Sequence, residues 1–78
     1  MFAKLILTKT MIDQFIYHGC LTVEEAEIVR LRTAKWTRER IADELHISVS
    51  TLDKRINRLK RVYDEIQRLH PELGLPKR

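Results

Sequence analysis

A chain of 78 residues with a formal net charge of +4 has room for one small domain. A domain of this size buries only about 60% of the surface that its unfolded form exposes, which leaves little room for an enclosed enzyme cleft. The basic balance favours a polyanionic partner, and nucleic acid is the commonest partner of this kind.

The residues that carry catalytic or metal chemistry are few and scattered. Cys20 is the only cysteine, so no disulfide can form within the chain, and the usual zinc-ligand spacings are missing. His18, His46 and His70 lie far apart in sequence, and no glycine-rich phosphate loop occurs. The apolar opening, residues 1–7, is interrupted too early for a signal peptide or a membrane span. We therefore expect a cytoplasmic protein that is no enzyme and uses no cofactor, metal or membrane.

The first predicted helix follows Thr10, which with Asp13 three residues later resembles a capping pair. We expect this helix over about 11–18, and Gly19 is expected to end it because glycine tolerates the left-handed conformation. The pattern of residues 1–9 is compatible with either an extended or a helical segment. Residues 1–20 are thus interpreted as an N-terminal helix and arm.

The next two predicted helices have stronger start signals. Thr22 with Glu25 forms a capping box, and the apolar residues that follow predict a helix over about 23–34. Thr37 can cap a short third helix that ends at Leu45.

The fourth predicted helix is the longest. Ser48 can cap it, and nothing breaks it before Pro71, so we expect it over 49–69. Residues 61–70 extend this helix, and 71–78 are interpreted as an irregular, flexible tail. The fold class is therefore all-α, a single domain over 1–78 of about four helices with a long C-terminal recognition helix. The apolar residues of that helix form one stripe at spacings of three and four: Leu52, Ile56, Leu59, Val62, Tyr63, Ile66 and Leu69.

The segment 38–57 has the features of a helix-turn-helix. Two helices that meet at a steep angle need a small residue at their contact and apolar inward faces. Ala42 supplies the small residue. His46 stands where glycine is common in the turn, and histidine enters the positive-φ region at moderate cost. The apolar faces come from Ile41, Leu45, Ile47, Leu52 and Ile56.

Three short motifs accompany this segment. Leu21-Thr22 opens a glutamate-rich helix, Ile41-Ala42 follows at a fixed distance, and 47–52 reads Ile-Ser-Val-Ser-Thr-Leu. With these motifs, the stretch 21–59 resembles the DNA-binding domain of LuxR-type (GerE-like) bacterial transcription regulators. Region 4 of sigma factors shares most of them, so 21–60 is interpreted as a LuxR/sigma-4-like core. The extra N-terminal helix and the unbroken fourth helix depart from the LuxR pattern.

The resemblance implies a bacterial or phage transcription regulator that reads the major groove of double-stranded DNA with helix 49–69. Residues facing outward near the start of that helix are the predicted base contacts: Val49, Ser50, Asp53, Lys54 and Asn57. Asp53 is equally well explained as an acidic residue favoured in the first helical turn. The predicted phosphate contacts lie within and beside the motif: Thr37, Arg38, Ser48, Thr51, Arg55, Arg58, Lys60 and Arg61.

The apolar stripe extends beyond what the motif needs to bury. Either the first helix, with Phe15 and Ile16, folds back to cover it, or two chains pair along it. We favour the homodimer slightly, because a monomer with a single recognition helix rarely gains enough specificity for its DNA site. The predicted dimer interface consists of Leu59, Val62, Tyr63, Ile66 and Leu69.

An alternative function is a protein-interaction module of the sigma-region-4 kind that binds RNA polymerase or a sigma factor. Salt dependence separates the two, because DNA binding through several phosphates weakens steeply with salt.

Overall fold

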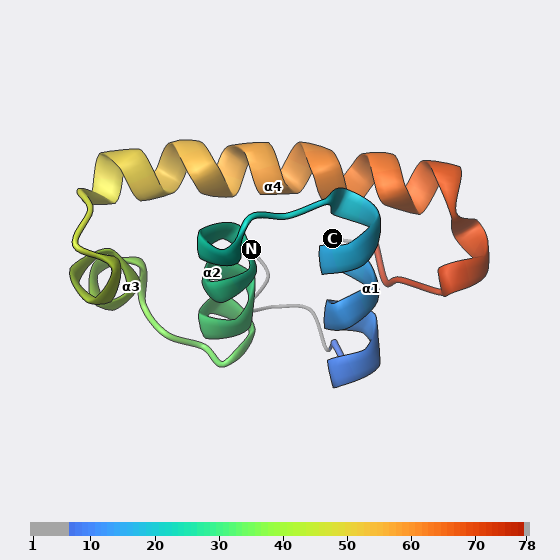
Figure 1. Ribbon diagram of the computed structural model, residues 1–78, viewed down its shortest axis with the longest axis horizontal. Coiled ribbons are helices and arrows are strands. Elements are labelled where there is room, and N and C mark those ends of the chain that lie inside the picture. The colour runs from blue at the N-terminus through green and yellow to red at the C-terminus, as the bar shows by residue number, and fades with distance from the viewer. Residues whose placement is uncertain (1–6, 78) are drawn as a thin grey trace.

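The computed structural model describes residues 7–77, and the expectations for residues 1–6 and 78 lie outside this range. Four α-helices follow one another as α1 (Lys9–Gly19), α2 (Val23–Thr33), α3 (Arg38–Leu45) and α4 (Val49–Leu69). Figure 1 shows α4 running the length of the molecule, with the three shorter helices along one side of it. The prediction of a small all-α domain with a long fourth helix is confirmed for the described part of the chain.

The predicted caps of α2, α3 and α4 are confirmed. Each cap has extended backbone angles, and its side chain accepts a hydrogen bond from the backbone amide three residues on, which satisfies one of the free donors of the first turn. At the start of α2 the Glu25 carboxylate also accepts from the Thr22 amide, which completes the capping box. The caps are Thr22, Thr37 and Ser48.

The predicted ends of α1 are wrong at both termini. Thr8, not Thr10, caps the helix, because its hydroxyl accepts from the Met11 amide at 3.2 Å. At the other end Cys20, with φ 50°, takes the left-handed position expected of Gly19. Gly19 instead serves close packing, because a Cβ there would lie 3.0 Å from a methyl carbon of Val62 on α4.

The core lies where α4 crosses the other helices. Phe15 of α1 and Tyr63 of α4 are fully buried, and their rings meet edge to face with centroids 5.3 Å apart. Burial of these large apolar surfaces fixes α1 against the second half of α4. Further fully buried side chains among the described residues are Ile28, Val29, Ile41, Leu52 and Leu59.

The structure corrects the predicted dimer interface. Leu59, Tyr63 and Ile66 are buried within the single chain, so no partner can reach them in this fold. Val62 is half-buried and packs against the same core, whereas Leu69 is 55% exposed. Of the two open interpretations, the structure adopts the one in which the first helix folds back over the stripe.

The prediction of an irregular tail holds for residues 74–77, which form no helix or strand, and is wrong for residues 71–73. Pro71–Leu73 form the short 3-10 helix η2, and Leu75 is buried at 7% exposure. The Tyr63 hydroxyl donates to the carbonyl of Pro76, and Gln67 donates to that of Leu75. The tail therefore packs back onto α4. Leu75 buries apolar surface there, and the carbonyls of Leu75 and Pro76 accept hydrogen bonds from side chains of α4.

Within residues 7–77, no helix combines the length and apolar character needed to cross a membrane.

Candidate nucleic-acid interface

The turn between α3 and α4 has the geometry that a helix-turn-helix requires. His46 adopts φ 58°, as predicted for this turn position. The amide of Ile47 donates to the carbonyl of Ala42 at 3.0 Å, and that of His46 donates to Asp43 at 3.2 Å. This pair of hydrogen bonds is a Schellman motif, which ends α3 at Leu45 and lets α4 begin at Val49 after three intervening residues.

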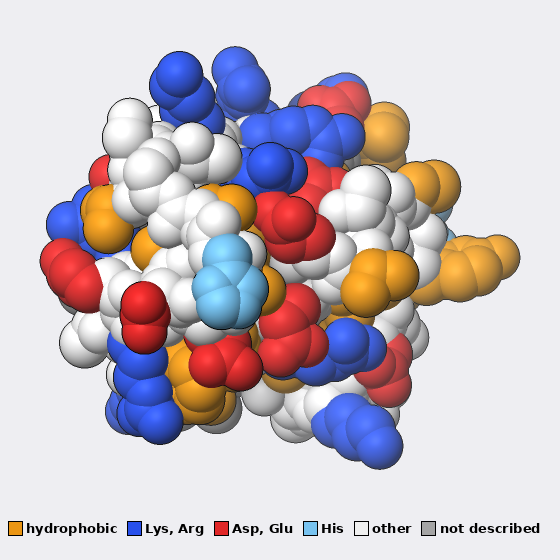
Figure 2. Space-filling view, turned by 60° about the vertical axis from the view of Figure 1, so that its left-hand side comes forward, with side chains coloured by type: hydrophobic (Ala, Val, Ile, Leu, Met, Phe, Trp, Pro, Cys, Tyr) orange, Lys and Arg blue, Asp and Glu red, His pale blue; other side chains and the backbone are white. Residues whose placement is uncertain are grey.

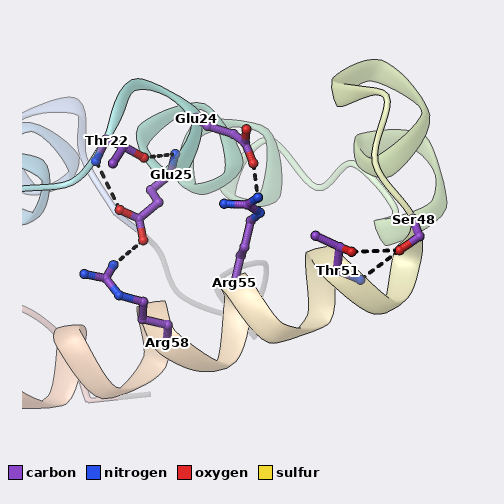
Figure 3. A network of polar contacts seen from close by, with 7 residues as sticks. All are labelled: Thr22, Glu24, Glu25, Ser48, Thr51, Arg55 and Arg58. Atoms are coloured by element: carbon purple, nitrogen blue, oxygen red, sulfur yellow. Dashed lines mark hydrogen bonds and ion pairs between the residues drawn. The ribbon is translucent and has the colours of Figure 1, made fainter.

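The first turn of α4 is held by two hydroxyl side chains. The Ser48 hydroxyl accepts from the Thr51 amide at 3.0 Å and donates to the Thr51 hydroxyl at 2.9 Å (Figure 3). Ser48 is exposed and Thr51 is half-buried. Both predicted phosphate contacts thus lie at the helix N-terminus, where the helix dipole favours an anion.

The five predicted base contacts do not share one environment. Ser50, Lys54 and Asn57 are exposed, on the side of α4 opposite the buried stripe. Val49 is half-buried and packs against the core. Asp53 is half-buried, and its carboxylate is paired with Arg38 in the free protein. The structure therefore leaves three of the five available on one face.

Asp53, a predicted base contact, forms an ion pair with Arg38, a predicted phosphate contact. The Arg38 guanidinium, at the start of α3, donates from one nitrogen to both oxygens of Asp53, at 2.9 and 3.0 Å. Side chains 15 positions apart in sequence thus join α3 to α4 across the turn. The side chains are 48% and 40% exposed, so the pair contributes little to stability.

Two predicted phosphate contacts, Arg55 and Arg58, point toward α2. The Nε atom of Arg55 lies 2.9 Å from a carboxylate oxygen of Glu24, although the pair lacks hydrogen-bond alignment. Arg58 donates to Glu25, whose side chain is only 7% exposed. Figure 3 shows both arginines reaching from α4 to the first turn of α2. Their charges are balanced within the chain, so the structure does not support the phosphate role predicted for these two residues.

A groove lies on the opposite flank of α4, and we call it the three-helix groove. It has a volume of about 370 Å³ and brings together one cation from each of α2, α3 and α4. Figure 2 shows several Lys and Arg side chains along the top of the molecule, with Asp and Glu side chains directly beside them. The lining residues are Arg32, Arg38, Asp53, Ile56, Asn57 and Lys60.

Arg32 is the member of this groove that sequence reasoning missed. It lies in the last turn of α2, outside the motif, and its guanidinium donates to the carbonyl of Trp36 at 2.7 Å. Arg40 of α3 lies 3.8 Å above the ring of Trp36. No motif spacing marks Arg32, because its position depends on how the loop from α2 to α3 folds back.

The remaining predicted phosphate contacts and the titratable residues lie elsewhere. Thr37 and Arg61 are exposed. His18 and His70, far apart in sequence, have ring centroids 4.5 Å apart, and His70 lies 3.1 Å from Glu72. The pKa of the Glu72 carboxyl is lowered, first by a backbone hydrogen bond and then by His70. Among the side chains of residues 7–77, no group of three metal-ligating residues could hold a metal ion.

A model of the homeodomain-like domain matches residues 22–70, which is more than half of the chain and extends from the cap of α2 to the end of α4. No curated protein and no solved structure matches the chain.

Proposed function

The chain belongs to the homeodomain-like domain family, and on that premise we propose that it is a sequence-specific, double-stranded DNA-binding regulator of transcription. In this proposal the first half of α4 enters the major groove. The observation that carries the proposal is the exposed face of Ser50, Lys54 and Asn57, directly after the turn and the Ser48 cap.

These three side chains have the chemistry of base readers. Lys54 can donate to the O6 and N7 acceptors of guanine, and Asn57 can pair with adenine through one donor and one acceptor. Ser50 can donate to or accept from either a base or a phosphate. Val49 and Asp53 are left out of the base-reading set, because one packs inward and the other is paired with Arg38.

The proposed phosphate contacts are those predicted residues that surround the exposed face without a carboxylate partner on α2. Arg55 and Arg58 are left out for that reason. The hydroxyl groups at the starts of α3 and α4 lie at positive dipole ends, and the cations flank the reading face. The set is Thr37, Arg38, Ser48, Thr51, Lys60 and Arg61.

The proposal includes a LuxR-type kinship of the segment 21–59, supported by the Leu21-Thr22 opening and the Ile41-Ala42 pair. It does not include the dimer interface predicted along α4, because α1 and the tail occupy that stripe. Binding to RNA polymerase or a sigma factor is the alternative function. The exposed apolar side chains Tyr17 (78%) and Leu69 (55%) are the observation that favours it.

The test begins with selection of bound duplexes from a random pool, which gives the preferred site. Lys54→Ala is then expected to weaken binding to that site about 10- to 100-fold and to relax preference at one base pair. Arg68→Ala is the matched control, because it removes a cation from the same helix about 21 Å further along its axis. Absence of an enriched site, or an equal loss in both variants, would contradict the proposal.

A further inference from the structure

The three-helix groove carries more positive charge than its own acid can balance. Arg32, Arg38 and Lys60 come from three different helices, and Asp53 is the carboxylate among the lining residues. On the other flank of α4 each arginine has its own glutamate. Cations thus outnumber carboxylates among the residues that line the groove.

Two of these cations are held in place before any ligand arrives. Arg32 is fixed by the carbonyl of Trp36 at 2.7 Å, which satisfies one of its donors and leaves others free. Arg38 is fixed by Asp53 at 2.9 and 3.0 Å. Pre-positioned donors lose little conformational freedom on binding, which favours an anion at this site.

The groove is continuous with the proposed reading face, because Asn57 belongs to both. An anion bound between Arg32, Arg38 and Lys60 would therefore lie beside the base that Asn57 contacts. The phosphates that border the major groove lie beside the exposed base edges, so contacts to them fix the register of a recognition helix.

We propose that the three-helix groove binds one DNA backbone phosphate. In the free protein the Asp53 carboxylate takes the place of this phosphate by pairing with Arg38. The proposal rests on the DNA-binding function proposed above. An ion pair as exposed as that between Arg38 and Asp53 is weak, so a phosphate can displace the carboxylate. Asp53 then acts as a competitor that lowers affinity for every duplex whose phosphate must displace it from Arg38.

The test compares duplex affinity for four variants that each change one side chain. Lys60→Gln and Arg32→Gln are expected to weaken binding about tenfold, equally for all sequences, because each removes a charge-assisted contact. Arg30→Gln removes the same charge from the exposed side of α2 outside the groove, and we expect a change of less than about twofold. Asp53→Asn is expected to tighten binding about two- to fivefold, since a weak competing ion pair is removed.

The role of Asp53 and the role of the groove cations are contradicted by different results. A loss of affinity in Asp53→Asn would show that the carboxylate contacts DNA, as a base acceptor would. Equal affinities for Lys60→Gln and Arg30→Gln would remove the groove as a phosphate site. Lys60 makes no ion pair within residues 7–77, so this variant stays informative if Arg32→Gln unfolds.

Titration with inorganic phosphate distinguishes a DNA backbone phosphate from a free phosphorylated ligand as the anion that the groove binds. We expect no saturation up to about 10 mM, because a backbone phosphate is held by its neighbours on the duplex as well. Saturation well below that concentration would instead assign the groove to a free phosphorylated ligand. If the wild-type chain binds no duplex at any salt concentration, the proposed function itself fails, whereas wild-type binding with unaffected groove variants removes only this inference.

Discussion

His46 carries the chain from α3 into α4 in the left-handed conformation, with φ 58°. A side chain in this region is strained by contact between Cβ and the carbonyl, and glycine avoids that contact. We expect His46→Gly to raise the free energy of unfolding by about 0.5–1 kcal/mol, after the entropic cost of the added glycine. Chemical denaturation monitored by circular dichroism measures the change.

The control for this prediction is a glycine at an ordinary helical position. Asp43 is exposed on α3, and Asp43→Gly should lower the free energy of unfolding by about 0.5–1 kcal/mol. Two variants with effects of opposite sign therefore isolate the backbone angle as the cause. Destabilisation by His46→Gly would mean that the imidazole makes a contact that matters more than the strain.

Single residues differ in how far the sequence predicts their environment. The turn at His46 and the cap at Ser48 depend on neighbours within four positions, and the sequence predicts both. The pairing of Arg38 with Asp53 depends on the angle between α3 and α4, which no local pattern encodes. For the same reason the sequence predicts Asp53 as a base contact, whereas its carboxylate is turned toward α3.

Arg58 and Arg61 lie within one turn of α4 and test which flank of the helix binds DNA. Arg58 pairs with the buried Glu25 of the α2 capping box, whereas Arg61 is exposed. We expect Arg58→Ala to lower the free energy of unfolding by about 1 kcal/mol, because it leaves a buried carboxylate without its ion pair. Duplex affinity should stay within about twofold once the protein is folded, since Arg58 faces α2.

Arg61→Ala is the reciprocal variant and should weaken duplex binding with little effect on unfolding. Fluorescence anisotropy with a labelled duplex and thermal unfolding, made on the same preparations, measure both quantities. A tenfold loss of affinity in Arg58→Ala at unchanged stability would restore the phosphate role that the sequence predicted for this residue.

The tail gives a second prediction at the level of elements. Leu75 is 7% exposed against α4, so Leu75→Ala should cost about 2 kcal/mol of unfolding free energy. Lys77→Ala, two residues further on and exposed, should change it by less than about 0.5 kcal/mol. Thermal unfolding of the two variants provides the measurement, and equal midpoints would mean that the tail does not pack as described.

The elements show which kind of information a sequence carries. The stripe on α4 predicts correctly that one face of the helix is buried, because spacing determines the face. It does not predict what buries that face, since α1, the tail and a second chain would all satisfy the same pattern. The sequence therefore predicts the extent of α4 and the helix-turn-helix, and it misplaces the dimer interface and the tail.

The whole molecule presents two flanks of α4 with different electrostatics. Toward α2 the arginines are balanced by Glu24 and Glu25, and toward α3 the three-helix groove has an excess of cations. The exposed reading face lies between these flanks. The flank of α4 toward α3 therefore has more positive charge among its lining residues than the flank toward α2, where each arginine is paired.

The most direct test of DNA binding by α4 is the affinity of the wild-type chain for a selected duplex as the salt concentration rises from about 50 to about 200 mM. With two or three phosphates neutralised by the proposed cations, the logarithm of the association constant should fall against that of salt with a slope of about −2 to −3, a loss of about 10- to 50-fold. Absence of duplex binding, or affinity that stays nearly constant across this range, would contradict the account and favour a protein partner.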